Sequence, residues 1–506
     1  MSAVLAANTN LNVLSSRVWA WVVAIFVIVI ILTGGISIPS AGMLLFQSSI
    51  SLAVLFLALF RLAGQGFPTR LAYWGAVLVC GAIGLLLLHL VPLPASVWTW
   101  FPGRELVQKN FELIGVSPGW SPLSLTPENT VADGIAMLPA IAAFLAVLSI
   151  KQRQVFWICG GIVVCAIASV ALSLLQHLHG EDPTYYLYDV TPGVGVGIFN
   201  NRSFFAAQLY TSIPVLSAYA VTAQQKWHLK PILVVAAGII YAGIILVGLS
   251  LSESRSGILL AMPAILFAVI LAFSRPHETR RSTVTTMALI ALMLGVLVLG
   301  QVSMAGLLRL TQIDPLTDYR AIIGKGSIEL GLWQFPTGSG FGSFVPLYQL
   351  HETPEMMHAE FVNHAHNDWL ELVIEGGAPA LFLLVAFVFW YLFSLVRVWR
   401  YGQGGQTALF QRMASLVIPL LLMHSFLDFP LRTPALMVLF SLCCGIMVLQ
   451  PDLAKGNFSS LRRAQPLKSG SGPVTAPERK SFQRPKTGFG AIKPSDQNGP
   501  DTDNLQ

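Results

Sequence analysis

The polar residues that could do chemistry gather in one short stretch of a largely apolar chain. Residues 361–377 read Phe-Val-Asn-His-Ala-His-Asn-Asp-Trp-Leu-Glu-Leu-Val-Ile-Glu-Gly-Gly, so His364, His366, Asn367 and Asp368 stand just before an apolar run. Only 11% of all residues are charged. Ionisable groups at the mouth of a membrane helix are costly to desolvate and are seldom kept there without a use. This stretch is therefore the first candidate site.

An imidazole titrates near neutral pH, so His366 can take a proton from a hydroxyl group. The alternative is an interfacial histidine that only makes hydrogen bonds, and both interpretations stay open at this point. His358, His364, His366 and Asp368 can also be read as metal ligands. Their spacing is irregular and no cysteine stands with them, so a metal site is the less favoured interpretation.

Arginines stand beside three other apolar runs. Arg255 lies in the tight turn Ser-Glu-Ser-Arg-Ser-Gly, Arg202 follows two asparagines, and Arg432 ends a turn that also contains Asp428. A guanidinium stays charged and matches phosphate oxygens, so arginines at one depth suit a lipid-linked phosphate or pyrophosphate. The alternative is an anchor that snorkels to the interface. The tight turn favours function for Arg255, whereas Arg202 and Arg432 stay open, and Arg432 can simply pair with Asp428.

Two further motifs allow more than one interpretation. Glu371 and Glu375 lie one helical turn apart, and carboxylates facing a polar cavity are favoured over a glycosidase-like pair. The glycines of Gly338–Phe344 allow tight turns or close backbone approach to a ligand, with a flexible turn as the alternative. They are no dinucleotide fingerprint, because no strand-then-helix context surrounds them.

The elements that must position these residues are membrane helices. The chain has 506 residues, of which 54% are hydrophobic. Because a helix of about 20 apolar residues crosses a bilayer, the sequence predicts an all-α polytopic membrane protein with about twelve transmembrane helices. The predicted spans are 18–34, 42–61, 71–92, 129–149, 154–175, 204–223, 231–249, 256–273, 284–304, 370–396, 413–427 and 433–450.

Lys and Arg concentrate in the short loops of one side, which predicts that both termini are cytoplasmic. The outer side then holds all the arginines named above and three long segments, 93–128, 176–203 and 305–369. The last is too long for a plain connector, so we expect it to be functional. Within it, spaced apolar residues over Tyr319–Trp333 predict a helix along the membrane surface.

Charge and cysteine usage exclude other classes. The net charge of +6 does not indicate nucleic-acid binding, because the excess lies in short loops and in a polar tail, 451–506, that we expect to be disordered and cytoplasmic. All five cysteines lie in apolar runs, so the sequence offers neither a disulfide framework nor zinc-type spacing.

Three motifs, taken in this order and topology, resemble the O-antigen ligase and polymerase superfamily. They are Ser254–Gly257, Gly338–Phe344, and His364–Leu372 followed by Glu-Gly-Gly. The stretch His424–Arg432 is similar to a further motif of many bacterial members. The resemblance divides the chain into N-terminal helices with outer loops (1–199), a core that includes the periplasmic loop 305–369 (200–390), a C-terminal helix pair (391–450) and the tail (451–506).

The resemblance implies a GT-C-like, metal-independent, inverting glycosyltransferase without cofactors in the bacterial inner membrane. Its donor would be a saccharide on undecaprenyl pyrophosphate at the periplasmic face. The acceptor would be lipid A–core in a ligase, a growing polysaccharide in a polymerase, or a protein hydroxyl in a related oligosaccharyltransferase. Membrane lipid and a polysaccharide assembly complex are the expected partners, and no nucleic acid is expected.

The resemblance also implies roles for single residues. His366 would activate the acceptor hydroxyl and Arg255 would hold the pyrophosphate. Asp368 or Asn367 would orient the imidazole of His366. The expected substrate contacts are Arg202, Arg320, Asn367, Asp368 and Arg432.

Two other classes of function remain as alternatives. A transporter or flippase of lipid-linked saccharide would place polar groups on both sides or at mid-membrane, whereas here they gather on one side. A scaffold for polysaccharide assembly would depend on the basic tail instead of His366. The sequence does not separate ligase, polymerase and protein transferase.

Overall fold

The computed structural model describes residues 15–180, 182–190, 194–273, 319–354, 356, 361–401 and 406–450. Eight helical segments in this part of the chain are long and apolar enough to cross a membrane. They are α2 (Ser16–Thr33), α3 (Ala41–Gln65), α4 (Arg70–Leu90), α7 with α8 (Pro127–Ala136 and Leu138–Leu148), η2 with α9 (Gln152–Gln154 and Val155–His179), α10 (Arg202–Trp227), α11 (Pro231–Ser252) and α17 (Asp368–Tyr401).

Three shorter apolar helices complete the bundle: α12 (Arg255–Phe273), α18 (Gln406–His424) and α19 (Pro434–Met447). Every predicted span except 284–304 coincides with one of these helices, with ends that differ by a few residues at most positions. The span predicted at 284–304 lies outside the described residues. The all-α membrane architecture is therefore confirmed, whereas the total of twelve spans stays a prediction.

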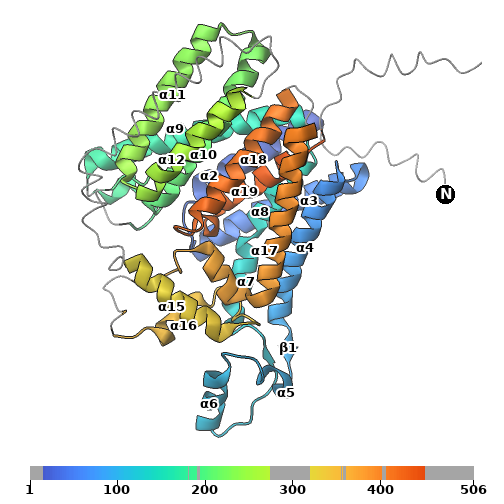
Figure 1. The fold of residues 1–506 in the computed structure, drawn as a ribbon, viewed down its shortest axis with the longest axis vertical. Coiled ribbons are helices and arrows are strands. Elements are labelled where there is room, and N and C mark those ends of the chain that lie inside the picture. The colour runs from blue at the N-terminus through green and yellow to red at the C-terminus, as the bar shows by residue number, and fades with distance from the viewer. Residues whose placement is uncertain are drawn as a thin grey trace, which may run out of the picture. The chain divides into compact units, whose positions relative to one another are not determined.

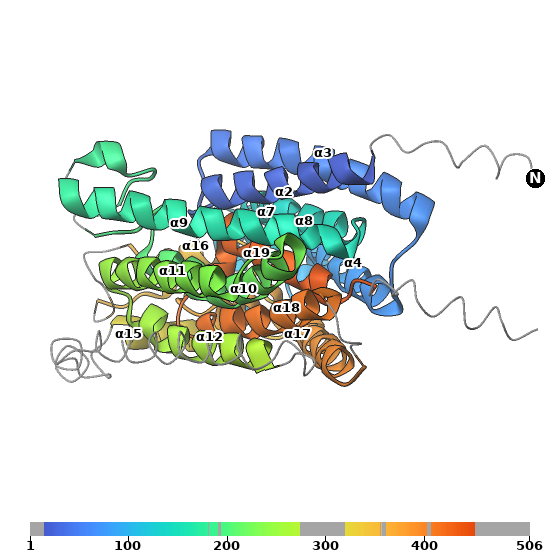
Figure 2. The ribbon, with the colours of Figure 1, turned by 90° about the horizontal axis from the view of Figure 1, so that it is seen from above.

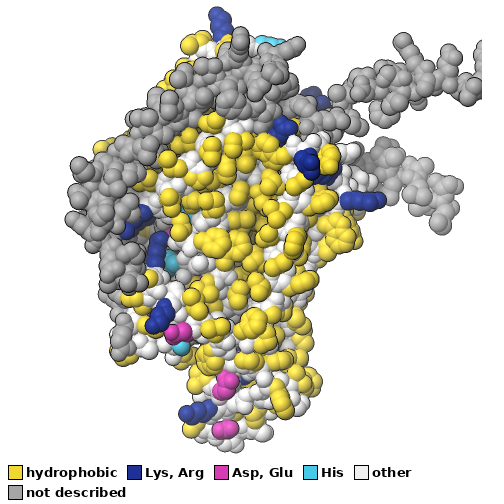
Figure 3. All heavy atoms as spheres, viewed as in Figure 1, with side chains coloured by type: hydrophobic (Ala, Val, Ile, Leu, Met, Phe, Trp, Pro, Cys, Tyr) yellow, Lys and Arg dark blue, Asp and Glu magenta, His cyan; other side chains and the backbone are white. Residues whose placement is uncertain are grey.

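The helices form layers around α10 (Figures 1 and 2). Helix α10 packs against α9, α11, α12 and α18. Of the 18 residues that make up its apolar stretch, 83% are buried. Helices α2 and α3 cover one side through α8 and α9, and α17 borders α4 and α18. Figure 3 shows a broad hydrophobic surface with Lys and Arg at its margin. Phe382 and Phe389 on α17 are 72% and 68% exposed, as expected for a helix that faces lipid.

The long connections meet at one end of the bundle, which we call the loop end. It comprises the described residues of 34–40, 91–126, 180–201, 253–254, 319–367 and 425–433. Backbone hydrogen bonds join these segments, for example from Leu125 to Ser339 and from Asn200 to Gly35. The short elements at this end are β1 (Pro92–Leu93) paired antiparallel with β2 (Ser121–Pro122), α5 (Ala95–Trp98), α6 (Glu105–Leu113), η3 (Pro183–Tyr185), α15 (Tyr319–Gln334), α16 (Phe344–His351) and η5 (Pro430–Arg432).

Helix α17 is broken near its start. Gly377 has φ 60° and ψ −152°, which interrupts the helical hydrogen bonds. The chain just after α15 fills the gap: Ser339 and Gly340 donate to the carbonyls of Ile374 and Glu375 at 3.1 and 2.8 Å. Gly338 also has positive φ, and a Cβ there would collide with the backbone of Glu375. The glycine motif therefore forms a tight turn whose close backbone approach is to α17, whereas the approach to a ligand stays a prediction.

The buried Arg104 also holds the turn Gly338–Phe344, which we call the glycine turn. Arg104 is 1% exposed and donates to the carbonyls of Leu123 and Gly338 and to the Gln334 amide oxygen. Burial lowers the pKa of Arg104 to about 10, so it remains charged at neutral pH. The segment 92–126, the end of α15 and the glycine turn therefore form one connected scaffold at the loop end.

Candidate active site

His366 lies in the turn that precedes α17. Its backbone has φ 50°, a left-handed conformation that is costly for a residue with a side chain. Its Nδ1 lies 3.0 Å from the Asp428 Oδ1, and its side chain is 21% exposed. Since a carboxylate only accepts, Nδ1–H donates, which leaves Nε2 with a lone pair. No hydrogen bond joins Nε2 to any described residue.

Asp428 is fully buried and receives three donors. Besides His366, the backbone N–H of Phe429 donates to it at 3.1 Å, and the Arg320 guanidinium approaches Oδ2 at 3.1 Å. Burial alone would raise the pKa of Asp428, but the hydrogen bond from His366 and the charge of Arg320 lower it to about 2. The carboxylate is therefore anionic at neutral pH and fixes the imidazole in the tautomer that exposes a basic Nε2. We call His366, Asp428 and Arg320 the His366 triad.

The residues expected to orient His366 do something else. Asn367 caps α17, since its Oδ1 accepts from the N–H groups of Trp369 and Leu370 at 3.0 Å each. The Asp368 Oδ2 accepts from the Ser425 hydroxyl at 2.7 Å and from the Leu431 N–H. The expectation that Asn367 or Asp368 orients the imidazole is therefore wrong. Their predicted contacts with substrate stay predictions.

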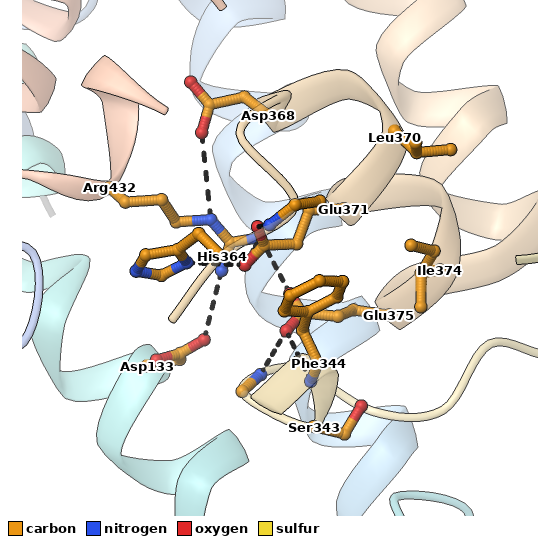
Figure 4. Close-up of polar contacts among 12 residues, drawn as sticks. Asp133, Ser343, Phe344, His364, Asp368, Leu370, Glu371, Ile374, Glu375 and Arg432 are labelled. Atoms are coloured by element: carbon orange, nitrogen blue, oxygen red, sulfur yellow. Dashed lines mark hydrogen bonds and ion pairs between the residues drawn. The ribbon is translucent and has the colours of Figure 1, made fainter. Parts of the chain in front are cut away.

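Arg432 lies inside a group of carboxylates (Figure 4). One terminal nitrogen lies 2.8 Å from the Glu375 Oε2 and 3.4 Å from the Glu371 Oε1. The other lies 3.5 Å from the Asp133 Oδ2, and Nε lies 3.9 Å from the Asp368 Oδ1. We call these five residues the Arg432 cluster.

The suggested pair of Arg432 with Asp428 is wrong, because Arg320 occupies that carboxylate. Burial alone would lower the pKa of Arg432, but the surrounding carboxylates raise it well above its usual range. Four carboxylates already engage its guanidinium, so the geometry gives no support to the prediction that Arg432 contacts a phosphate.

The two glutamates of α17 are 1% and 0% exposed and face protein groups instead of a polar cavity. Glu371 accepts from the His364 Nδ1 at 2.8 Å and from the Ala365 N–H at 2.9 Å. The Glu375 Oε1 accepts from the N–H of Gly342 at 2.9 Å, which ties it to the glycine turn. His364, Glu371 and Arg432 thus form a second network of a histidine, a carboxylate and an arginine, which we call the His364 triad.

Arg202 and Arg255 are the first residues of α10 and α12. Both side chains are exposed, and neither makes an ion pair or hydrogen bond with a residue that the structure describes. Hydroxyl contacts join the two helix starts, since the Ser203 Oγ lies 3.4 Å from that of Ser256 and 3.5 Å from that of Ser254. Helix N-termini carry positive partial charge, so these two starts with their arginines suit an anion such as a diphosphate.

The Phe429 ring lies between the first turn of α10, the helix that Arg202 begins, and the rings of His364 and His366. Its ring centroid lies 5.1 Å from that of Phe204 in the first turn of α10. The same ring lies 4.2 Å from the His364 ring and 5.0 Å from the His366 ring. The structure thereby brings together at the loop end residues that are far apart in the sequence, as predicted.

Among the described residues, no group of three or more His, Cys, Asp or Glu side chains could hold a metal ion. His358, one of the residues considered as a ligand, lies outside the described residues. His364 and His366 turn to different carboxylates, Glu371 and Asp428.

Sequence reasoning missed the role of Asp428. Its only signal was its place in the outer turn His424–Arg432, and nothing local linked it to a histidine 62 positions earlier. Arg320 was expected to contact substrate, but the structure also assigns it to Asp428.

Residues 240–385 match the family model described as O-antigen ligase. The matching segment contains the Arg255 turn, the glycine turn and the His366 stretch, so the resemblance to the O-antigen ligase superfamily is confirmed over these residues. No curated protein matches the chain. The family match and the apolar helices together indicate a multi-pass membrane enzyme of O-antigen or polysaccharide assembly.

Proposed function

Since residues 240–385 carry the O-antigen ligase segment, we propose that the chain is an inverting glycosyltransferase. It moves a saccharide from undecaprenyl pyrophosphate to an acceptor hydroxyl at the periplasmic face, as ligase or polymerase. The observation that carries this proposal is the His366–Asp428 pair, whose Nε2 makes no hydrogen bond with any described residue. The Phe429 ring lies between the His366 ring and Phe204 in the first turn of α10, the helix that Arg202 begins.

In the proposed reaction, the His366 Nε2 accepts the proton of the acceptor hydroxyl, and the oxygen attacks the anomeric carbon. The bond from that carbon to the diphosphate oxygen breaks on the opposite face, so the anomeric configuration inverts. Asp428 stabilises the imidazolium that forms, as a buried carboxylate does in other histidine-based sites. No metal is needed for this step, because arginines supply the positive charge.

The leaving diphosphate gains negative charge as the bond breaks. Arg255 and Arg202 lie at the positive ends of two helices, and we assign this charge to them. Arg432 is left out of this role because its guanidinium already has four carboxylate neighbours.

The test is saccharide transfer by the purified protein in lipid nanodiscs with chelator present. Undecaprenyl-pyrophosphate oligosaccharide is the donor, and lipid A–core and further donor compete as acceptors, so the product separates ligase from polymerase. We expect His366→Ala and Arg255→Ala to fold and fail to transfer. The matched controls are His177→Ala, an exposed histidine of α9, and Arg70→Ala, an exposed arginine that begins α4. Full transfer by His366→Ala would remove the proposed base.

A further inference from the structure

Helix α15 has two contrasting faces. Its inner face buries Ile323 and Leu330 completely against α16 and α17. Its outer face exposes Ile328 by 53% and Leu332 by 74%, beside the exposed Lys325. Large apolar side chains in a row on an outer helix face indicate contact with something other than water. Exposed apolar residues with a lysine about one helical turn before them are typical of a helix that lies on a membrane surface.

Contacts fix the depth of this helix relative to the lipid-facing surface. The first turn of α15 is held to the end of α18, because Arg320 donates to the carbonyl of Leu427 at 3.0 Å. Next to it, Phe426 is 58% exposed and stacks on Trp369 with ring centroids 4.8 Å apart. Tryptophans at the ends of membrane helices are typical of the headgroup level, and Trp369 lies in the first turn of α17. The start of α15 therefore lies at that level, and Figure 1 shows α15 running obliquely to α4 and α17.

We propose that the outer face of α15 lies in the headgroup layer of the membrane, and that this contact keeps Arg320 on Asp428. The partner is the surface of the same bilayer. Arg320 reaches from the first turn of α15 to the carboxylate that holds His366, so a shift of α15 away from the lipid withdraws Arg320 from the triad. Arg320 is thus a positioning residue, and this second step rests on the proposed function.

Lipid contact is tested without any transfer reaction. In a Cys80→Ser background, Leu332→Cys and Leu113→Cys receive the same fluorophore, in nanodiscs that carry nitroxide at the lipid headgroup. The two leucines match closely, with 74% and 75% exposure, but Leu113 lies on α6, away from the spanning helices. Phe389→Cys on α17 gives the reference for a lipid-facing position.

We expect the headgroup nitroxide to quench the label at position 332 several-fold more than the label at 113. Equal quenching at these two positions overturns the proposal. A label at 332 that is shielded from a water-soluble quencher but not quenched by lipid also overturns it, and assigns the face to a protein partner. These results stand whether or not the chain proves to be a glycosyltransferase.

The link to His366 is tested in the transfer assay. Ile328→Asp with Leu332→Asp should lower kcat by about tenfold and leave KM within a few-fold, because the withdrawn guanidinium no longer holds the carboxylate of Asp428 that positions His366. Arg320→Ala should give the same loss of kcat, and adding the two aspartates to it should lower kcat no further. Leu113→Asp is the control that leaves kcat unchanged. A fully additive loss, or an effect on KM with kcat unchanged, contradicts the link.

Discussion

The His366 triad and the His364 triad use the same three kinds of residue in different surroundings. In both, a histidine Nδ1 lies within 3.0 Å of a buried carboxylate that also faces an arginine. The arginine of the His366 triad is 44% exposed and its histidine 21% exposed, against 19% and 10% in the His364 triad. Arg432 also faces three further carboxylates, those of Asp133, Asp368 and Glu375.

This difference teaches that residue type does not decide whether such a network does chemistry. A base needs a nitrogen that substrate can reach, and the His366 Nε2 meets that condition. The His364 Nε2 is buried without a partner, and the surrounding ion pairs link α7, α17, η5 and, through Glu375, the glycine turn. We therefore expect the first network to act in catalysis and the second to hold the loop end together.

The largest expected effect is on the rate of transfer. His366→Ala should lower kcat by about 10²- to 10⁴-fold, the usual contribution of a general base. His364→Ala should leave kcat within a few-fold, because its imidazole has no access to substrate. Transfer rates of the two variants in nanodiscs, normalised to folded protein, check this. A folded His364→Ala protein as inactive as His366→Ala would break the comparison.

The next effect concerns folding stability. Arg432→Ala leaves buried carboxylates without a counter-charge, and removing one partner of a buried ion pair lowers the free energy of unfolding by about 3–5 kcal/mol. Thermal unfolding in detergent measures this, with Arg70→Ala as the exposed control. Unchanged thermal stability of Arg432→Ala would show that the carboxylates of the Arg432 cluster are already protonated.

The third prediction uses acid. Because the pKa of Asp428 is about 2 when folded and near 3.9 when unfolded, its ionised form stabilises the fold above pH 4 by about 2 kcal/mol. This contribution is lost as the pH falls from about 4 to 2. The stability difference between wild type and Asp428→Asn should therefore shrink over that range and stay constant between pH 5 and 7. A difference independent of pH below 4 would contradict the ion pair.

The smallest effect separates the two arginines. Arg320→Ala should change the free energy of unfolding by less than about 1 kcal/mol, because the Arg320 side chain is 44% exposed and its charge is screened by solvent. The buried carboxylate of Asp428 keeps its hydrogen bonds from His366 and from the Phe429 N–H. Its thermal unfolding should resemble that of Arg70→Ala even though its transfer rate falls. A loss of stability comparable with that of Arg432→Ala would remove the distinction between the triads.

Helix positions followed from the sequence, whereas pairings did not. An apolar run long enough to cross a bilayer is a local property of the sequence. The predicted spans therefore agree with the long and short apolar helices wherever the structure describes them. Charge pairs depend on which helices become neighbours. A pair between Arg432 and Asp428, four positions away, was one of the two open interpretations, yet Asp133, 299 positions away, is one of the partners of Arg432.

The same reason explains the error about His366. Asn367 and Asp368 are its neighbours in sequence, but their side chains have other partners. Asn367 caps α17, and Asp368 accepts hydrogen bonds from Ser425 and Leu431. The tight turn of the glycine motif could be predicted, because positive φ is a property of glycine itself. What it approaches depended on the break in α17, which the sequence did not reveal.

That break has a consequence for exchanging parts between relatives. The outer loop and α17 are not separate modules, because the backbone of residues 336–340 completes the hydrogen bonds that α17 lacks at 374–378. A loop grafted alone would meet a foreign helix interruption and leave those backbone groups unpaired. Chimeras made to change acceptor preference should therefore carry 336–344 and 371–378 together, with Arg104 or its equivalent matched to the new turn.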